Sequence, residues 1–273
     1  MGNRITYTLD IWRRLIGVQI RGQMQYRLPF FFDLFGTLFI TLTEFTSFAL
    51  VLPRFENIGG WTLGEVAVLY GTVNISFGLM DMLFSGFDPS NFGRQVRLGA
   101  FDQLLLRPIS ITLQVFGMEF MLRRIGRIAV GGGILALALH LTNIHWTVTK
   151  GLLLLLAIAG QVAYFGGLFM IGATITFWTV ESIEFVNILT YGGTELISYP
   201  MHIYPDWLRR FFTYVLPAIF LNYYPALYIL DKPDPFGLPA YAPWLAPAAG
   251  LLILAAAARC WRFGIAHYQS TGT

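Results

Sequence analysis

The chain has 273 residues, of which 56% are hydrophobic and only 12% are charged. With a net charge of +3 and a mean hydropathy of +0.61, it carries too few charges to cover a soluble globule. The same values exclude a disordered chain, and the small basic excess argues against nucleic acid as a partner. The composition predicts an all-α integral membrane protein.

The first predicted element, residues 1–27, is an amphipathic helix. Its apolar residues recur at helical spacing, and arginines occupy its other faces. Such a helix lies in the interface between head groups and hydrocarbon rather than crossing the membrane. Five apolar segments follow that are long enough to span about 30 Å of hydrocarbon. These segments are residues 28–52, 63–84, 125–141, 152–178 and 242–261.

The region between residues 182 and 230 is apolar but interrupted by prolines. It holds either two spans, or one span and a segment that enters and leaves on the same side. With one span at 183–199 and an external re-entrant helical hairpin at 201–230, thirteen of the 18 basic residues fall on one face. Because Lys and Arg accumulate in cytoplasmic loops, this arrangement is favoured. It predicts six transmembrane helices and two cytoplasmic termini.

Residues 87–124 form the longest predicted cytoplasmic loop. Gly99, a residue type that often ends helices, and Pro108 divide this loop into two short helices at an angle. An apolar ridge at residues 104–106 would then project into the cytoplasm as a docking surface. The alternative is an amphipathic loop that rests on the membrane.

The chain lacks the motifs of several common enzymes. No G-x-x-x-x-G-K-[ST] loop occurs, so ATP is not bound in that way. The G-x-S-x-G and H-E-x-x-H motifs are also missing. His140 and His145 fall on different faces of a helix, which argues against a metal site. We therefore expect no enzymatic activity, no metal and no cofactor in this chain.

Carboxylates within the predicted spans are candidates for function, because an ionisable group in hydrocarbon is costly. Facing a cavity, they would favour a substrate with positive charge and apolar bulk, aided by aromatic rings through cation–π contacts. Alternatively, they are protonated or hydrogen-bonded between helices. We favour this second interpretation for Asp81 and leave both open for Glu44 and Glu195. The candidate substrate-pathway residues are Glu44, Asp81, Glu195, Phe45, Phe48 and Tyr191.

The order of these elements resembles the permease subunit of bacterial type-two ABC exporters. The stretch RLGAFDQLLLRP at residues 97–108 is similar to the loop before the third span in one branch of that family. A second similar stretch contains Tyr199-Pro200, residues 203–205, Pro217 and residues 222–225. The resemblance covers essentially the whole chain.

The resemblance implies that the cytoplasmic loop is a coupling helix that fits a groove of a separate ATP-binding subunit. It also implies a working unit of two ATPases, which bind Mg-ATP, and two permeases, which are often related but non-identical chains. The ATPase-coupling residues would be Arg94, Arg97, Asp102, Leu104, Leu105, Leu106 and Arg107. The external hairpin would be a gate or a packed lid, with Pro217, Asn222, Tyr223 and Pro225.

The leading hypothesis is an ATP-driven exporter in the bacterial inner membrane, surrounded by lipid. It would move an amphipathic, cationic, drug-like substrate out of the cell by alternating access, as in multidrug efflux. The alternative is a proton-linked secondary transporter or channel that acts without an ATPase, with Glu44 and Glu195 relaying protons. The lack of internal duplication between the two halves of the chain counts against this alternative. A membrane-bound enzyme or scaffold has no residue-level support.

Overall fold

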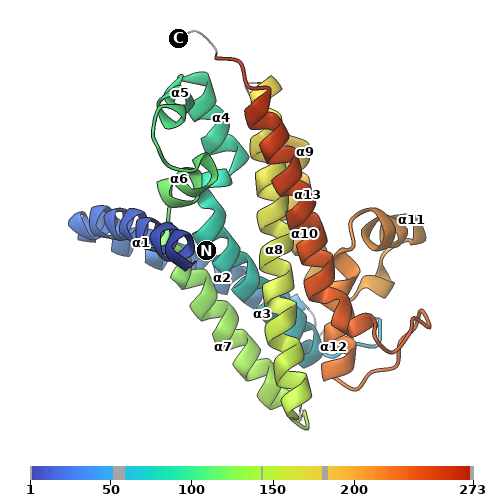
Figure 1. Ribbon diagram of the computed structural model, residues 1–273. Helices are drawn as coiled ribbons and strands as arrows, with labels where there is room; N and C mark the ends of the chain where they lie inside the picture. Colours follow the sequence, from blue (N-terminus) through green and yellow to red (C-terminus); the bar gives the residue numbers. More distant parts are fainter. Residues whose placement is uncertain (1, 52–58, 143, 180–183, 271–273) are drawn as a thin grey trace.

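The computed structural model describes residues 2–51, 59–142, 144–179 and 184–270 (Figure 1). All regular structure within these ranges is helical. Five of the helical segments are long and apolar enough to cross a membrane: Arg27–Ser47, Leu63–Arg97, Leu122–Leu141, Val148–Thr179 and Ala242–Ala266. This architecture confirms the all-α integral membrane fold predicted from the composition.

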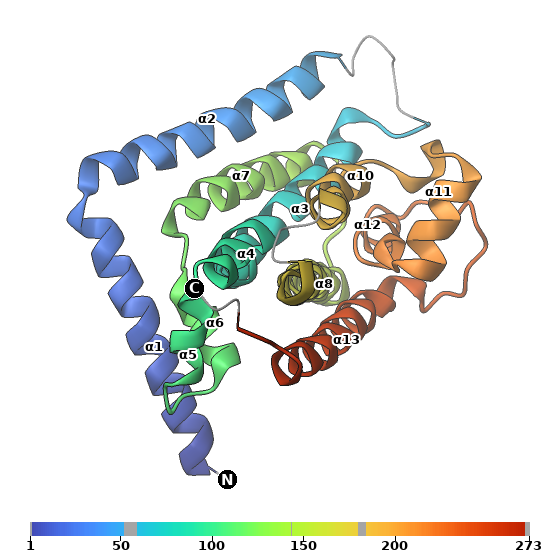
Figure 2. The same ribbon diagram turned by 90° about the horizontal axis from the view of Figure 1, so that it is seen from above.

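The first two helices form a corner. Helix α1 (Gly2–Gln25) and helix α2 (Arg27–Val51) meet at Tyr26 and enclose the other helices as the two arms of an L (Figure 2). Helix α1 runs across the direction of the long helices (Figure 1), as expected for an interfacial helix. Helix α2 packs only along one side, so that 6% of its most apolar segment is buried within the chain.

The centre is a bundle of four helices: α3 (Leu63–Phe84), α7 (Ile125–Leu141), α8 (Val148–Thr179) and α13 (Ala246–Ala266). Helix α3 begins with a capping box, in which the Thr62 amide donates to Glu65 and the Glu65 amide donates to Thr62. Helices α8 and α13 approach closely, because a Cβ built on Gly250 would lie 2.1 Å from the Gly160 carbonyl oxygen. Small residues thus set the helix packing.

Short helices extend the bundle at one end. Helix α3 continues through η2 (Ser85–Phe87) into α4 (Pro89–Arg97), followed by α5 (Ala100–Leu105), α6 (Ile111–Met118) and η3 (Leu122–Arg124). Asp88 caps α4, since its carboxylate accepts hydrogen bonds from the amides of Ser90 and Asn91. Gly99 has φ +68° and reverses the chain between α4 and α5. The predicted break at Gly99 between two short helices is confirmed.

The proline-interrupted region contains only short helical segments. The predicted fifth span is helical from residue 184, in α9 (Glu184–Asn187), the π-helical η4 (Ile188–Gly192) and α10 (Gly193–Ile197). This segment is not among the five membrane-length helices, so a crossing of the membrane here, which would bring the total to six, stays a prediction.

Two helical arms then meet at Leu216-Pro217, in the middle of the predicted external hairpin. The first arm is η5 (Met201–Ile203), α11 (Asp206–Arg210) and the π-helical η6 (Phe211–Val215). The second arm is η7 (Ala218–Phe220) and α12 (Tyr223–Ile229), which leads to η8 (Ala242–Leu245) and α13.

Candidate functional site

A cavity of about 410 Å³ opens between α2, the start of α7 and the η4–α10 segment. Three of the predicted substrate-pathway residues, Glu44, Tyr191 and Glu195, line this cavity. Glu44 is far in the sequence from Tyr191 and Glu195, so its meeting with them is a result of the fold. The other lining residues are Thr37, Ile40, Thr41, Arg124, Arg127, Gly192 and Thr194.

The two glutamates of this cavity are available to a ligand. Neither Glu44 nor Glu195 makes a hydrogen bond or ion pair to another group in the described part of the chain. The neighbouring hydroxyls are already used, since Thr41 donates to the Thr37 carbonyl at 2.9 Å and Thr194 donates to the Tyr191 carbonyl at 2.6 Å. The interpretation of Glu44 and Glu195 as hydrogen-bonded links between helices is therefore not supported by these contacts.

The cations of the cavity are held by helix α3. Nε of Arg124 lies 2.6 Å from Oδ2 of Asp81. This contact is an ion pair without hydrogen-bond geometry, because neither atom has a hydrogen-bond partner among the described groups. Nε of Arg127 donates to Oδ1 of Asn74 at 2.8 Å, and its guanidinium lies 4.6 Å from the centre of the Phe77 ring. Both arginines are thus engaged with protein groups.

The Arg124 ion pair corrects one expectation. Asp81 does not line this cavity, because its side chain is buried and faces Arg124. The spacing gives only a partial signal: Asn74 and Asp81 are seven residues apart on one face of α3, and Arg124 and Arg127 are three apart at the start of α7, but neither spacing shows that the two helices are adjacent.

One of the three predicted aromatic residues is shown at the cavity. Tyr191 stands edge-on to Phe77, with ring centres 5.4 Å apart, and its hydroxyl donates to Oδ2 of Asp88 at 3.4 Å. Phe45 instead packs on the ring of Tyr70, with centres 5.5 Å apart, and is not a lining residue. The side chain of Phe48 lies outside the described residues.

The short helices at the end of the bundle carry an exposed apolar and basic surface. Leu106 is 85% exposed and Leu105 is 42% exposed. Leu98, which the sequence interpretation did not include, is 70% exposed. The predicted exposure of the ridge at 104–106 is wrong for Leu104, because its side chain is buried in the core and cannot contact a partner. The exposed basic residues of this surface are Arg94, Arg97 and Arg107.

Asp102, another predicted coupling residue, is half-buried against the C-terminal segment. Its Oδ2 accepts a hydrogen bond from the Ser270 hydroxyl at 2.6 Å. Burial and the nearby negative charge of Asp102 raise the pKa of Tyr268 to about 12. The Tyr268 ring stands edge-on to Phe101, with centres 4.8 Å apart. Asp102 therefore fastens the end of the chain to α5.

The predicted gate residues are packed into the protein. Nδ2 of Asn222 donates to the carbonyls of Leu69 at 3.2 Å and Ile197 at 2.8 Å, so α12 is tied to two other helices. Tyr223 is buried and stacks on Trp61, with ring centres 5.7 Å apart. Pro225 is also buried, whereas Pro217 is half-buried at the break between η6 and η7. This geometry is that of a packed lid, and opening of the lid stays a prediction.

The fold and cavity define a polytopic membrane protein of the transporter class, with short helices beyond one end of its bundle. The chain belongs to the ABC-2 family of transporter proteins, whose family model matches residues 38–272. It is thus the permease subunit of a type-two ABC transporter, and the family implies an ATP-binding partner. No curated protein and no solved structure matches the chain significantly. The described residues contain no group of three His, Cys, Asp or Glu side chains placed to hold a metal ion.

Proposed function

We propose that this permease subunit exports an amphipathic, cationic, drug-like compound from the cytoplasm across the bacterial inner membrane. The observation that carries the proposal is the cavity with Glu44 and Glu195, two carboxylates with no protein partner in the described ranges. Asp81 neutralises Arg124, so the cavity and its immediate surroundings hold three carboxylates and two guanidinium groups. Tyr191 adds an aromatic ring that attracts cations.

A second permease would complete the pathway. Helix α2 leaves a broad apolar face uncovered, and Phe35 and Phe39 on it are 63% and 72% exposed. The substrate cavity is bounded by this same helix. A related chain packed against α2 would cover the cavity and place a second set of lining residues opposite Glu44. The substrate would then pass between the two permeases.

The exposed surface of α4 and α5 would dock on the ATPase subunit. Leu98, Leu105 and Leu106 supply apolar contact, and the neighbouring arginines supply positive charge. Since α4 follows α3 almost without a break, movement of the docked helices would be passed to the bundle (Figure 1). The hydrogen bond from the Tyr191 hydroxyl to the Asp88 carboxylate links the start of α4 to the cavity wall. ATP-driven closure would thereby alternate the cavity between inward and outward access.

Transport by inside-out vesicles tests the substrate proposal. The permease, its ATPase and any sister permease are reconstituted, and ATP-dependent uptake of the lipophilic cation tetraphenylphosphonium is measured. Glu195→Gln and Glu44→Gln should each lower uptake about tenfold, the effect of one lost charge-assisted contact. Asp206→Asn, a change of an exposed carboxylate on α11 outside the cavity, should have no effect. Unchanged cation uptake in both glutamate variants would refute the assignment.

Co-purification tests the docking surface. Leu106→Glu should remove most of the ATPase that purifies with the tagged permease, because it places a carboxylate in an apolar contact. Gln103→Glu adds the same charge at an exposed position of α5, three residues before Leu106, and should retain the ATPase. Uptake that follows a proton gradient without any ATPase would contradict the exporter and favour the secondary transporter.

A further inference from the structure

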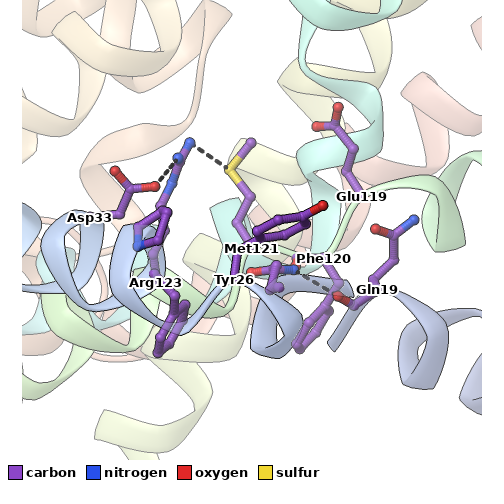
Figure 3. Close-up of a pocket in the computed structure, with 10 residues that line it drawn as sticks. Gln19, Tyr26, Asp33, Glu119, Phe120, Met121 and Arg123 are labelled. Carbon is purple, nitrogen blue, oxygen red and sulfur yellow. Dashed lines mark hydrogen bonds and ion pairs between the residues drawn. The ribbon is translucent and has the colours of Figure 1, made fainter. Parts of the chain in front are cut away.

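A second cavity of about 280 Å³ lies in the corner between α1 and α2, and we call it the corner cavity (Figure 3). Its third wall is the segment from Glu119 to Arg123, which connects α6 to α7. None of its residues lines the substrate cavity. The lining residues are Gln19, Gln23, Tyr26, Pro29, Phe30, Asp33, Glu119, Phe120, Met121 and Arg123.

The walls of the corner cavity are fixed by hydrogen bonds to the backbone. Nε2 of Gln19 donates to the Met118 carbonyl. Nε2 of Gln23 donates to the Phe120 carbonyl, and its Oε1 accepts from the Leu122 amide at 3.1 Å. These bonds hold α1 against the segment before α7. The cavity is therefore a built feature of the fold rather than a gap beside a loose helix.

Charges of both signs line this cavity and are incompletely paired. Nη1 of Arg123 donates to Oδ2 of Asp33 at 3.3 Å, and the two side chains are 39% and 57% exposed. Nη2 of Arg123 contacts the Met121 sulfur at 3.6 Å. Oε2 of Glu119 accepts from Nδ2 of Asn91 at 3.3 Å. In Figure 3 the Arg123–Asp33 pair and Glu119 lie on either side of the Tyr26 ring.

The position of the corner cavity beside α1 is the one expected for a site at the depth of lipid head groups. Helix α1 is amphipathic and runs across the bundle, as helices in the membrane interface do. Next to the corner, Leu28 and Phe32 are 72% and 75% exposed, so α2 presents apolar side chains outward beside the cavity. A ligand here would meet charged groups in the cavity and apolar side chains along α2. That combination matches an amphipathic lipid.

We propose that the corner cavity binds the head group of a phospholipid with a primary ammonium group, phosphatidylethanolamine. Arg123 binds the phosphate, because guanidinium groups match phosphate oxygens. Asp33 and Glu119 accept hydrogen bonds from the ammonium, which has three N–H donors. The volume of about 280 Å³ is just below the range of sites for whole small ligands, which suits a head group whose acyl chains stay along α2.

The same chemistry discriminates between head groups. A choline head group has no N–H donor for the two carboxylates, so it loses the hydrogen bonds at that end. A glycerol head group leaves the lipid with a net negative charge beside two carboxylates, which repel it. Phosphatidylethanolamine satisfies all three charged side chains. The proposal does not depend on the substrate or on the direction of transport.

Competition between lipids tests the proposal. The assembled transporter is equilibrated with equal amounts of phosphatidylethanolamine, phosphatidylcholine and phosphatidylglycerol of identical acyl chains, and the retained lipid is measured by native mass spectrometry. Wild type should retain phosphatidylethanolamine about tenfold over each of the other two, the effect of one charge-assisted contact. Equal retention of the three lipids, or a preference for phosphatidylglycerol, overturns the proposal without the need for any variant.

Substitutions then locate the site. Arg123→Gln should lower phosphatidylethanolamine retention about tenfold, whereas Asp33→Asn and Glu119→Gln should lower its preference over phosphatidylcholine. Arg14→Gln is the matched control, because it breaks an exposed ion pair with Asp10 on α1 outside the cavity. If Arg123→Gln prevents assembly, Arg123→Lys keeps the charge and should show a smaller loss. Wild-type lipid preference in all cavity variants overturns the assignment.

Discussion

Breaking the Asp81–Arg124 ion pair should destabilise the protein strongly. The Asp81 side chain is 3% exposed and that of Arg124 is 23% exposed, so water screens the pair little. Removing one partner of a buried pair typically costs about 3–5 kcal/mol, because the other charge is left uncompensated. Arg124 keeps one side toward the substrate cavity. We therefore expect Asp81→Leu to cost about 3 kcal/mol, at the lower end of that range.

Replacing both partners should be far less harmful. The double variant Asp81→Leu with Arg124→Met removes both charges of the pair, so that neither is left without its partner, and we expect it to differ from wild type by less than about 1 kcal/mol. Unfolding by denaturant in detergent, followed by tryptophan fluorescence, gives the free energies for a double-mutant cycle. Asp10→Asn, at an exposed pair with side chains 79% and 55% exposed, should cost less than about 1 kcal/mol. A double variant as unstable as Asp81→Leu would refute the reasoning.

Three further predictions concern other parts of the molecule. Gly250→Ala should cost about 1–3 kcal/mol in the same unfolding assay, because its Cβ would lie 2.1 Å from the Gly160 carbonyl oxygen; Gly133→Ala, where a Cβ meets nothing within 4 Å, should be neutral or stabilising. Asn222→Ala should cost about 1–3 kcal/mol, because two carbonyls lose a buried donor. Burial raises the pKa of Glu119 above its usual value of 4.5, so the native chain keeps this proton to a higher pH than the unfolded chain. The protonated Glu119 therefore contributes stability that is fully present below pH 4.5 and is lost as the pH rises through the native pKa. Over this pH interval, the melting temperature of Glu119→Gln should fall less than that of wild type. An identical pH dependence of the two proteins would contradict this explanation.

The long apolar helices and the break at Gly99 were accessible from the sequence. Helix α3 ends at Phe84 and α7 begins at Ile125, as the apolar runs predict, because hydrocarbon and core both demand uninterrupted apolar faces. Gly99 was recognisable because only glycine adopts positive φ at low cost. These features depend on residues close together in the chain.

Features that depend on distant partners were not accessible. Leu104, Leu105 and Leu106 have the same side chain, and a run of three leucines has no period that shows which one is buried. The π-helical turns of η4 and η6 have no recognisable signal in the local sequence. The pairing of Asp81 with Arg124 requires α3 and α7 to be adjacent, which spacing within either helix cannot establish.

Helix α8 is longer than a membrane is thick. Its 32 residues rise about 48 Å at about 1.5 Å per residue, against about 30 Å of hydrocarbon. Near its end Phe177 contacts Phe92 of α4 and Phe101 of α5, with ring centres 5.5 Å and 4.9 Å apart. Helices α4 and α5 are thus fixed to the end of a helix that is long enough to span the bilayer. If α4 and α5 dock on the ATPase as proposed, membrane thickness sets how far the docking surface stands from the lipid, and a thicker bilayer would bring it closer.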